Sequence, residues 1–303
     1  MKRLALILLL TVCTTSAVWA QNDLIVSQYI HNRFAINPAF AGCREGLSLF
    51  GSFRKQWSGI KKSPMSELIT AHMPLKRENI VLGLSLYNQN IHQSMNAGVL
   101  ATIGYRARVG ERTWLSFALQ PGVSMRSTDW SKVLTIDEGD IVFEEKESSI
   151  SPLLGFGVAL YNRNLFAGLS VNSLMVSDDF EQRQAKFDPV NSTYILTAGY
   201  MFRAGDDFKF QPSAMLSYDK KNSVTADVTL TAIFNNLIWA NIAYRTTDDA
   251  IAGVAVQATP QLKVAYSYDF NFGDLNGYNS GSHEISLQYD LVYKVKTVGP
   301  RFF

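Results

Sequence analysis

Ser282, His283 and Glu284 lie next to one another near the C-terminal end of the chain and have the residue types of a hydrolytic triad. A nucleophilic serine needs a base within hydrogen-bond reach and a third group that orients the base. Side chains that follow one another in a strand point to opposite faces, so Ser282 and Glu284 share a face and His283 faces away. We therefore predict no triad and no enzyme activity, and the sequence has no GxSxG or phosphate-binding motif.

The sequence has no motif that would bind a metal or cofactor. Its four histidines, His31, His72, His92 and His283, lack the close spacing of common zinc motifs. The stretch Asp137-Glu138-Gly139-Asp140 has oxygen ligands that suit calcium, but the full spaced calcium motif is absent. We interpret it as part of a solvated acidic loop and predict no cofactor. The acidic residues of the candidate partner-binding loops are Asp129, Asp137, Asp140, Asp178 and Asp179.

The elements that carry these residues are predicted to be strands. Apolar and polar residues alternate from Leu262 to Phe270, and again from Glu284 to Lys294. Alternation with a period of two predicts strands with one apolar and one polar face. The apolar faces are long and aromatic and the polar faces are charged, which is typical of a barrel that meets lipid outside and encloses a polar lumen.

Fourteen such segments follow residue 46, with about ten residues each, as a tilted membrane strand requires. Their connections are short after even-numbered strands and mostly longer after odd-numbered ones; Arg126–Ser149 and Met175–Asn191 are the longest. This pattern predicts an all-β, antiparallel transmembrane β-barrel in the lipid bilayer of an outer membrane, with both termini in the periplasm. The predicted strands lie at about 47–57, 66–74, 80–89, 97–109, 113–125, 150–162, 165–174, 192–203, 208–218, 223–234, 237–246, 250–259, 262–270 and 283–294.

The last strand is expected to close the barrel by pairing with the first, and to leave the membrane near Tyr293.

Charges on the polar faces have both signs, among them Arg106, Lys263, Glu284 and Asp290, so we expect charge pairs across the interior rather than a selective ion path. Aromatic residues near strand ends predict interfacial girdles. These aromatic residues are Tyr105, Trp114, Tyr161, Phe166, Tyr200, Phe202, Trp239, Tyr244, Tyr289 and Tyr293.

The two ends of the chain differ from the strand pattern. Residues 1–20 have the form of a signal peptide, with Lys2 and Arg3, an apolar stretch and a cleavage site at Val18–Ala20. Residues 21–46 contain Asn-Pro and Ala-Gly turns and are predicted to form a plug-like segment at or in the periplasmic mouth. The barrel then takes residues 47–294, and residues 295–303 form a C-terminal periplasmic tail.

Net charge gives no support for nucleic-acid binding. The 303 residues include 28 Lys and Arg against 26 Asp and Glu, and removal of Lys2 and Arg3 leaves equal numbers. Cys43 would be the single cysteine left after the signal peptide, so it forms no disulfide within the chain.

Two groups of residues carry a resemblance. Near the N-terminus they are Gln28-Tyr29, Asn37–Gly42 and Arg54–Trp57; near the C-terminus they are Ala265–Phe270, Gly281–Tyr289 and Pro300–Phe303. Together they resemble the PorP/SprF family, outer-membrane proteins of the type IX secretion system of Bacteroidota. The motif residues are Asn37, Pro38, Ala39, Gly42, Arg54, Trp57, Tyr266, Tyr268, Asp269, His283, Glu284, Tyr289 and Phe303.

The resemblance implies a role in protein export to the cell surface and, in some members, in gliding motility. The implied partners are components of the periplasmic secretion ring, or exported cargo with a secretion C-terminal domain. It implies no catalytic residues. The alternative is a channel for hydrophobic or small solutes like those of the FadL type, whose N-terminal plug also carries an Asn-Pro-Ala turn, as Asn37–Ala39 does here.

Overall fold

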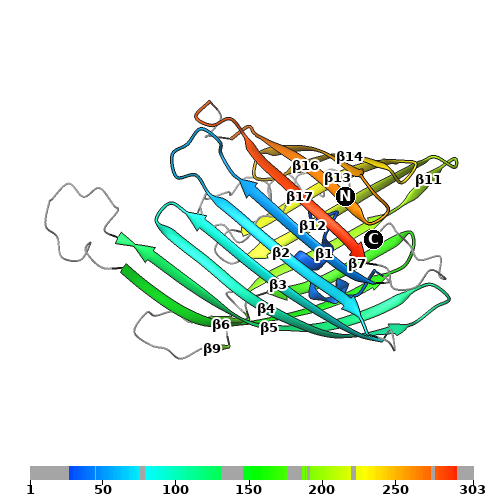
Figure 1. The fold of residues 1–303 in the computed structure, drawn as a ribbon, viewed down its shortest axis with the longest axis horizontal. Helices are drawn as coiled ribbons and strands as arrows, with labels where there is room; N and C mark the ends of the chain where they lie inside the picture. The colour runs from blue at the N-terminus through cyan, green and yellow to red at the C-terminus, as the bar shows by residue number, and fades with distance from the viewer. Residues whose placement is uncertain are drawn as a thin grey trace, which may run out of the picture.

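The computed structural model describes residues 27–44, 46–75, 79–130, 146–172, 174–176, 186–187, 189, 192–219, 223–273 and 277–291. These residues form a closed antiparallel β-barrel with fourteen strands in its wall (Figure 1). β1 pairs with β17 and β10 pairs with β12, which closes the ring. The wall strands are β1 (Leu47–Lys55), β2 (Met65–Pro74), β3 (Ile80–Ile91), β4 (Ser94–Arg108), β5 (Trp114–Asp129), β6 (Lys146–Tyr161), β7 (Leu165–Asn172), β10 (Thr193–Tyr200) continued by β11 (Phe202–Ala204), β12 (Phe208–Asp219), β13 (Ser223–Phe234), β14 (Ile238–Arg245), β15 (Asp249–Gln257), β16 (Leu262–Asn271) and β17 (Ser282–Leu291).

A small two-stranded sheet lies outside the wall, in one of the connections between wall strands. β8 (Met175–Val176) and β9 (Lys186–Phe187) pair in a small separate sheet within the long connection between β7 and β10. We call the barrel end with the connections 109–113, 162–164 and 235–237 the turn end, and the opposite end the loop end. The sequence predicts a longer loop at 90–96, but β3 and β4 are joined at the loop end by His92 and Gln93 alone, with a left-handed φ of 59° at His92.

The alternation of apolar and polar residues builds the wall as predicted. On β16, Val264 and Tyr266 are exposed on the outside, whereas Lys263, Ser267 and Asp269 are buried inside. The same holds around the barrel: the buried residues of the wall are mostly polar, and its exposed residues are mostly large and apolar. This is the reverse of a water-soluble protein and suits an outer wall in contact with lipid. The predicted fold class is confirmed.

The predicted closure between the last and first strands is also confirmed, in a register that runs from the pair Leu47 and Leu291 to the pair Lys55 and His283. One strand end differs from the prediction, and another is untested. β17 is described as far as Leu291, and the predicted exit near Tyr293 lies outside the described residues. The predicted first strand includes Trp57, but β1 ends at Lys55, because Trp57 adopts a left-handed φ of 46° that turns the chain away from the ladder.

The long connection predicted at 126–149 is partly strand, because β5 extends to Asp129 and β6 begins at Lys146. Asp129 pairs in register with Lys146, and Thr128 pairs with Glu147. Polar and oppositely charged cross-strand pairs therefore continue the ladder beyond the apolar part of the wall. Figure 1 shows this β5–β6 ribbon reaching past the neighbouring strands. Asp129 thus belongs to a strand rather than a loop.

Four of the predicted girdle residues face the wrong way for that role. Tyr161, Phe166 and Trp239 are buried inside the barrel, and Trp114 packs against the same buried cluster as Tyr161 and Phe166. Aromatic character predicts a place near a strand end but not a face, and one position of register decides the face. The exposed aromatic residues on the outside that agree with the prediction are Tyr105, Tyr200, Phe202, Tyr244 and Tyr289.

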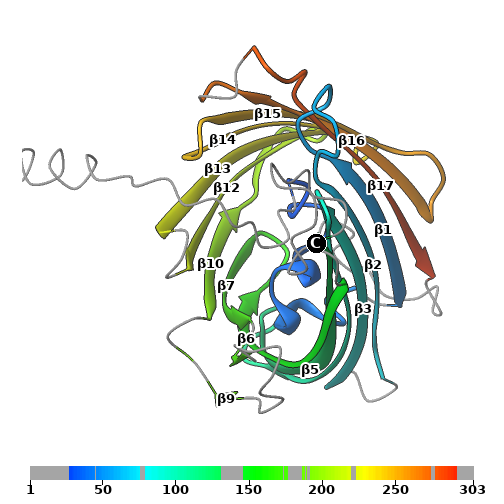
Figure 2. The same ribbon diagram turned by 90° about the vertical axis from the view of Figure 1, so that its left-hand side faces the viewer.

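Residues 27–44, which precede β1, lie inside the barrel, as the view along it in Figure 2 shows. They contain two short 3-10 helices, η1 (Arg33–Ala35) and η2 (Pro38–Phe40). Asn37 caps η2 and Pro38 is its first residue, where the missing proline N–H has no cost. Within the described ranges, no helix has both the length and the apolar character needed to cross a membrane.

Candidate functional site

Residues 27–44, which we call the plug segment, run through the lumen from one end of the barrel to the other. Ser27 contacts Asp269 and Glu284 near the loop end, and Arg44 pairs with Asp290 at the turn end, with 2.6 Å between Nη1 and Oδ2. The sequence predicts a segment at or in one mouth of the barrel. The contacts extend well beyond a mouth, because polar wall residues along the whole lumen bind to it.

Near the loop end, five charged side chains from five strands form a buried network. Arg54 on β1 places Nη2 2.7 Å from Asp269 Oδ2 and Nη1 3.3 Å from Glu284 Oε2. Arg245 binds Asp227 through its Nε, 2.8 Å from Oδ1, and has Nη1 3.9 Å from Asp269. These side chains are at most 4% exposed, so their charges are stable inside the barrel only as partners.

The plug segment completes this network. Three carboxylates face two guanidinium groups, and Ser27 supplies two further donors: its backbone N–H to Glu284 Oε2 at 3.0 Å and its hydroxyl to Asp269 Oδ2 at 2.7 Å. Arg54 Nη1 in turn donates to the Ser27 hydroxyl at 2.8 Å. The serine therefore lies between the arginine and both of its acidic partners, and the plug segment and the wall share one set of hydrogen bonds.

Gln28 extends these contacts along β16 and β17. Its Nε2 donates to Ser267 Oγ at 3.2 Å and to the Glu284 carbonyl at 2.9 Å, and its Oε1 accepts from the Ser286 hydroxyl. A buried amide with all these partners fixes the chain direction at this point, because each lost partner would leave a buried polar atom unsatisfied.

In the middle of the lumen, two wall glycines form a notch for Asn37. Its Oδ1 accepts from the Ala39 N–H at 2.9 Å, and its Nδ2 donates to the Val158 carbonyl at 3.2 Å. A Cβ at Gly157 on β6 would lie 2.1 Å from Asn37 Oδ1, and one at Gly168 on β7 would lie 2.7 Å from Nδ2. The absence of these two side chains is what admits the Asn-Pro-Ala turn to the wall.

Apolar contacts on the same side explain the inward aromatic residues. Phe40 packs against Tyr161 and Phe166, with ring centroids 5.9 and 6.2 Å apart, and Phe34 belongs to the same buried cluster. The Arg33 guanidinium lies 3.7 Å from the centre of the Phe166 ring. The plug segment therefore shares an apolar core with β3, β5, β6 and β7, in addition to its polar contacts.

At the turn end, Gly42 joins the plug segment to two wall side chains. Its N–H donates to His72 Nδ1 at 3.0 Å, and its carbonyl accepts from Arg106, whose guanidinium lies 4.5 Å from the centre of the Trp114 ring. Gly42 has a φ of 64°, and a Cβ there would lie 2.5 Å from Val81 Cγ1. Both the conformation and the close packing require glycine.

Burial also sets the protonation states of His31 and Cys43 in the plug segment. It lowers the pKa of His31 well below its usual value, and the positive charges of Lys263, Arg44 and Arg33 lower that pKa further, so the imidazole is neutral at pH 7. Burial raises the pKa of Cys43, so its thiol stays protonated and reacts weakly.

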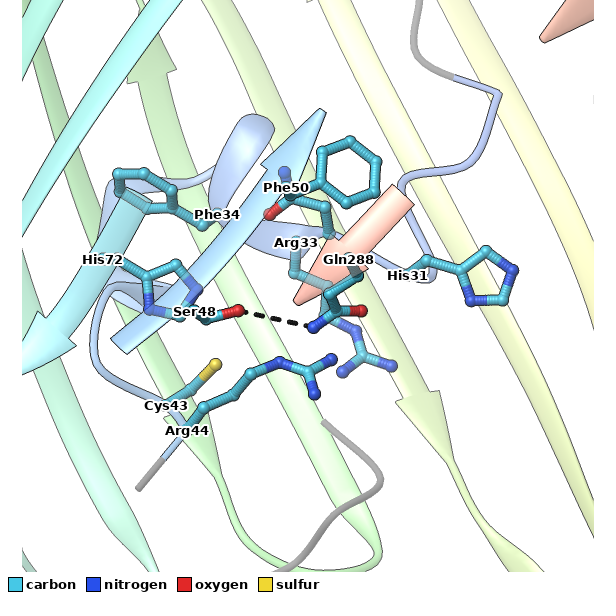
Figure 3. Close-up of a pocket in the computed structure, with 10 residues that line it drawn as sticks. His31, Arg33, Phe34, Cys43, Arg44, Ser48, Phe50, His72 and Gln288 are labelled. Atoms are coloured by element: carbon cyan, nitrogen blue, oxygen red, sulfur yellow. Dashed lines mark hydrogen bonds between the residues drawn. The ribbon is translucent and has the colours of Figure 1, made fainter. Parts of the chain in front are cut away.

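The plug segment occupies the described lumen, and small cavities lie beside it. One cavity, shown in Figure 3, lies between the plug segment and the wall residues Ser48, His72 and Gln288. Another lies against β12, β13, β14 and β16. Each has about 10 Å³ of room for the centre of a water-sized group, enough for one water molecule. No three His, Cys, Asp or Glu side chains converge as metal ligands in the part of the chain that is described.

Comparison with known proteins identifies the family of this chain. The sequence profile of the family described as type IX secretion system membrane protein PorP/SprF matches residues 18–289. The chain belongs to this family. No curated protein matches it in sequence.

Among solved structures, this PorP/SprF protein is similar to two toluene transporters. The Pseudomonas putida transporter TodX is 9% identical with a TM-score of 0.51, covering 86% of this chain and 94% of its own. The Ralstonia pickettii transporter TbuX is 7% identical with a TM-score of 0.50, covering 88% and 94%. At such identities the likeness concerns the barrel fold alone.

The remaining PorP/SprF motif residues lie apart from the lumen. Tyr266, Tyr268 and His283 are on the outer wall, where the Tyr266 hydroxyl lies 2.8 Å from His283 Nδ1 and the Tyr268 and His283 rings are 5.0 Å apart. Ser282 and Glu284 face the lumen, so the predicted split of this tripeptide between two faces is correct. Outside the described residues lie Asp137, Asp140, Asp178, Asp179 and Phe303.

Sequence reasoning therefore found part of this site. Arg54, Asp269 and Glu284 were singled out from two distant motifs, and the structure brings them together. Asp227 and Arg245 were missed as a pair, although each occupies a polar-face position of its strand. A search for opposite charges on the inward faces of neighbouring strands would have found them.

The notch predicts a large effect from one added side chain. Gly157→Val should displace Asn37, because the new Cβ would overlap its Oδ1, at a cost of about 1–3 kcal/mol. We expect Cys43 of this variant to react with a maleimide about tenfold faster or more than Cys43 of the wild type, since a destabilisation of 1.4 kcal/mol corresponds to a factor of ten. Mass spectrometry would locate the label. Gly51→Val is the matched control, because no atom lies within 4 Å of a Cβ at Gly51; equal rates in both variants would contradict the notch.

The charge network predicts unequal effects from two arginine substitutions. Arg54→Met would leave Asp269 and Glu284 without their guanidinium and should destabilise the barrel by about 3–5 kcal/mol. Arg44→Met breaks a pair whose side chains are 12% and 24% exposed and should cost about 1 kcal/mol or less. Urea unfolding in detergent micelles, followed by gel mobility, would compare them, and similar losses would count against a buried network that depends on Arg54.

Proposed function

We propose that this barrel acts as a protein-docking component of type IX secretion in the outer membrane, where it supports the export or surface attachment of cargo proteins. The observation that carries the proposal is the plug segment, which is bound along the whole length of the described lumen. A lumen that the chain's own plug segment occupies along its length favours action through the barrel's surfaces over free passage. Family membership supports the secretion context.

Removal of the plug segment would be costly, which supports docking over passage. Its loss would take two donors from Asp269 and Glu284 and would expose the notch at Gly157 and Gly168. Buried carboxylates that lose donors are destabilised by a few kcal/mol. The barrel therefore favours the filled state.

We assign the docking of cargo to the loop end and the contact with ring components to the turn end. The β5–β6 ribbon, which carries Asp129 and leads to Asp137 and Asp140, extends the loop end, and the connection that includes Asp178 and Asp179 is the other proposed partner-binding loop. In this proposal the loop end faces the cell surface and the turn end, like both termini, faces the periplasm. Gliding adhesins are one class of cargo that fits this assignment.

The alternative function is a channel for hydrophobic or small solutes. The barrel fold of the toluene transporters and the Asn-Pro-Ala turn at Asn37–Ala39 favour it. The water-sized cavities of the described lumen favour the docking proposal instead.

Conductance separates these two functions. In planar bilayers the wild-type barrel should be sealed, whereas a variant that lacks residues 27–44 should show steady conductance, because the polar lumen would then fill with water. Wild-type conductance equal to that of the deletion variant, or uptake of hydrophobic solutes by the wild type, would favour a channel.

Export of surface proteins tests the proposed function itself. Deletion of the gene should abolish the export or attachment of one or more cell-surface proteins. A gene whose residues 131–145 are replaced by a Gly-Ser linker should insert a folded barrel at the wild-type level but fail to restore that attachment. Asp248→Gly, which changes an exposed turn at the same barrel end, is the control and should restore it fully. A deletion strain with unchanged surface proteins would reject the proposal.

A further inference from the structure

A small cavity between the plug segment and the opposite wall is surrounded by hydrogen-bond donors. The side chains that form its polar part come from the plug segment and from β12, β13, β14 and β16, and none of its described lining residues is acidic. This wall is the side of the lumen opposite the glycine notch. The polar and aromatic lining residues are His31, Arg44, Gln211, Thr231, Trp239 and Lys263.

Lys263 is the strongest sign of a missing partner. Its side chain is buried, with 7% exposure, and its Nζ lies 4.0 Å from the centre of the Trp239 ring. Among the described residues, no carboxylate and no hydrogen-bond acceptor is bound to it. A buried ammonium is rarely stable without a counter-charge. The aromatic ring stabilises it in part.

Two neutral donors in the same cavity also lack partners. Gln211 is 4% exposed, and its Oε1 accepts a hydrogen bond from Arg33, while its Nε2 has no partner. Thr231 is 2% exposed, and its hydroxyl likewise has none within the described ranges. Gln211 and Thr231 are directly paired across β12 and β13, so both donors reach the cavity from one place on the wall.

The plug segment contributes Arg44 and His31 from the other side. Arg44 lines this cavity and pairs with Asp290. Figure 3 shows the His31 ring turned away from Phe34 and His72. As a neutral imidazole, His31 offers one further N–H donor.

We infer that this cavity binds a small monatomic anion, of the size of chloride. Lys263 is its counter-charge, and Gln211 Nε2 and the Thr231 hydroxyl are its hydrogen-bond donors. Room for one water-sized group limits the ligand to this size and excludes a sugar phosphate or a nucleotide. The anion would join the plug segment to the wall at a place where direct hydrogen bonds to Lys263 are lacking.

Thermal unfolding in different sodium salts at equal ionic strength tests this site, with the full-length protein in detergent. Chloride should raise the unfolding midpoint of the wild type by roughly 2 °C or more relative to gluconate, because it binds the folded state and gluconate is too large to enter. Formate has three heavy atoms, so it should raise the midpoint no more than gluconate does. An effect of formate equal to that of chloride would contradict the assignment to this one-water cavity.

Substitutions then assign the effect to the cavity. Lys263→Gln should remove the response to chloride, whereas Lys263→Arg, which keeps the charge, should retain it. Lys209→Gln is the matched control, because Lys209 also faces the lumen from the same wall but donates to Asn236 Oδ1 at 2.6 Å. An equal midpoint in chloride and gluconate for the wild type, or the same response in Lys263→Gln as in the wild type, would overturn the inference.

Discussion

Charge inside a barrel whose outer wall suits lipid is the constraint on which the rest of this structure depends. The alternation that places Tyr266 and Val264 outside places Asp269 and Lys263 inside. Charged groups in such an interior need water, a counter-ion or a partner. Because the plug segment occupies the described lumen, the charged wall residues are stabilised mainly by pairing with one another. Arg54 and Arg245 bind the three carboxylates of the loop-end network.

The plug segment follows from the same constraint. Ser27 donates to the carboxylates of Asp269 and Glu284, and Gln28 donates to the Glu284 carbonyl, so the segment supplies donors to this acidic part of the wall. On the other side of the lumen the segment is apolar, and there the wall turns Tyr161 and Phe166 inward to meet Phe40. The inside of this barrel is therefore not uniformly polar: each part of the wall is complementary to the part of the plug segment that it contacts.

This complementarity explains what the sequence could and could not predict. Period-two alternation is a local signal, so it located the strands, their faces and the pairing of β1 with β17. The inward position of Trp239, the pair formed by Asp227 and Arg245 and the glycine notch depend on register and on contacts between residues far apart in the chain. The extension of β5 to Asp129 was hidden for a different reason: beyond the membrane the ladder continues without an apolar face, so the alternation that marks a strand is lost.

The plug segment is attached to the wall by two anchors, the charge network and the glycine notch. Their arrangement bears on function more than the fold does. The fold is shared with toluene transporters at 9% identity or less, so the contents of the lumen have to distinguish docking from transport. The charge network joins the plug segment to β1, β13, β14, β16 and β17, whereas the notch joins it to β6 and β7. The segment thus links two halves of the barrel through contacts of different kinds. A change that weakens one anchor leaves the other in place, so opening the lumen requires both to break together. A docking protein needs no such opening, since its partners can bind at either end while the linked interior holds the wall rigid beneath them.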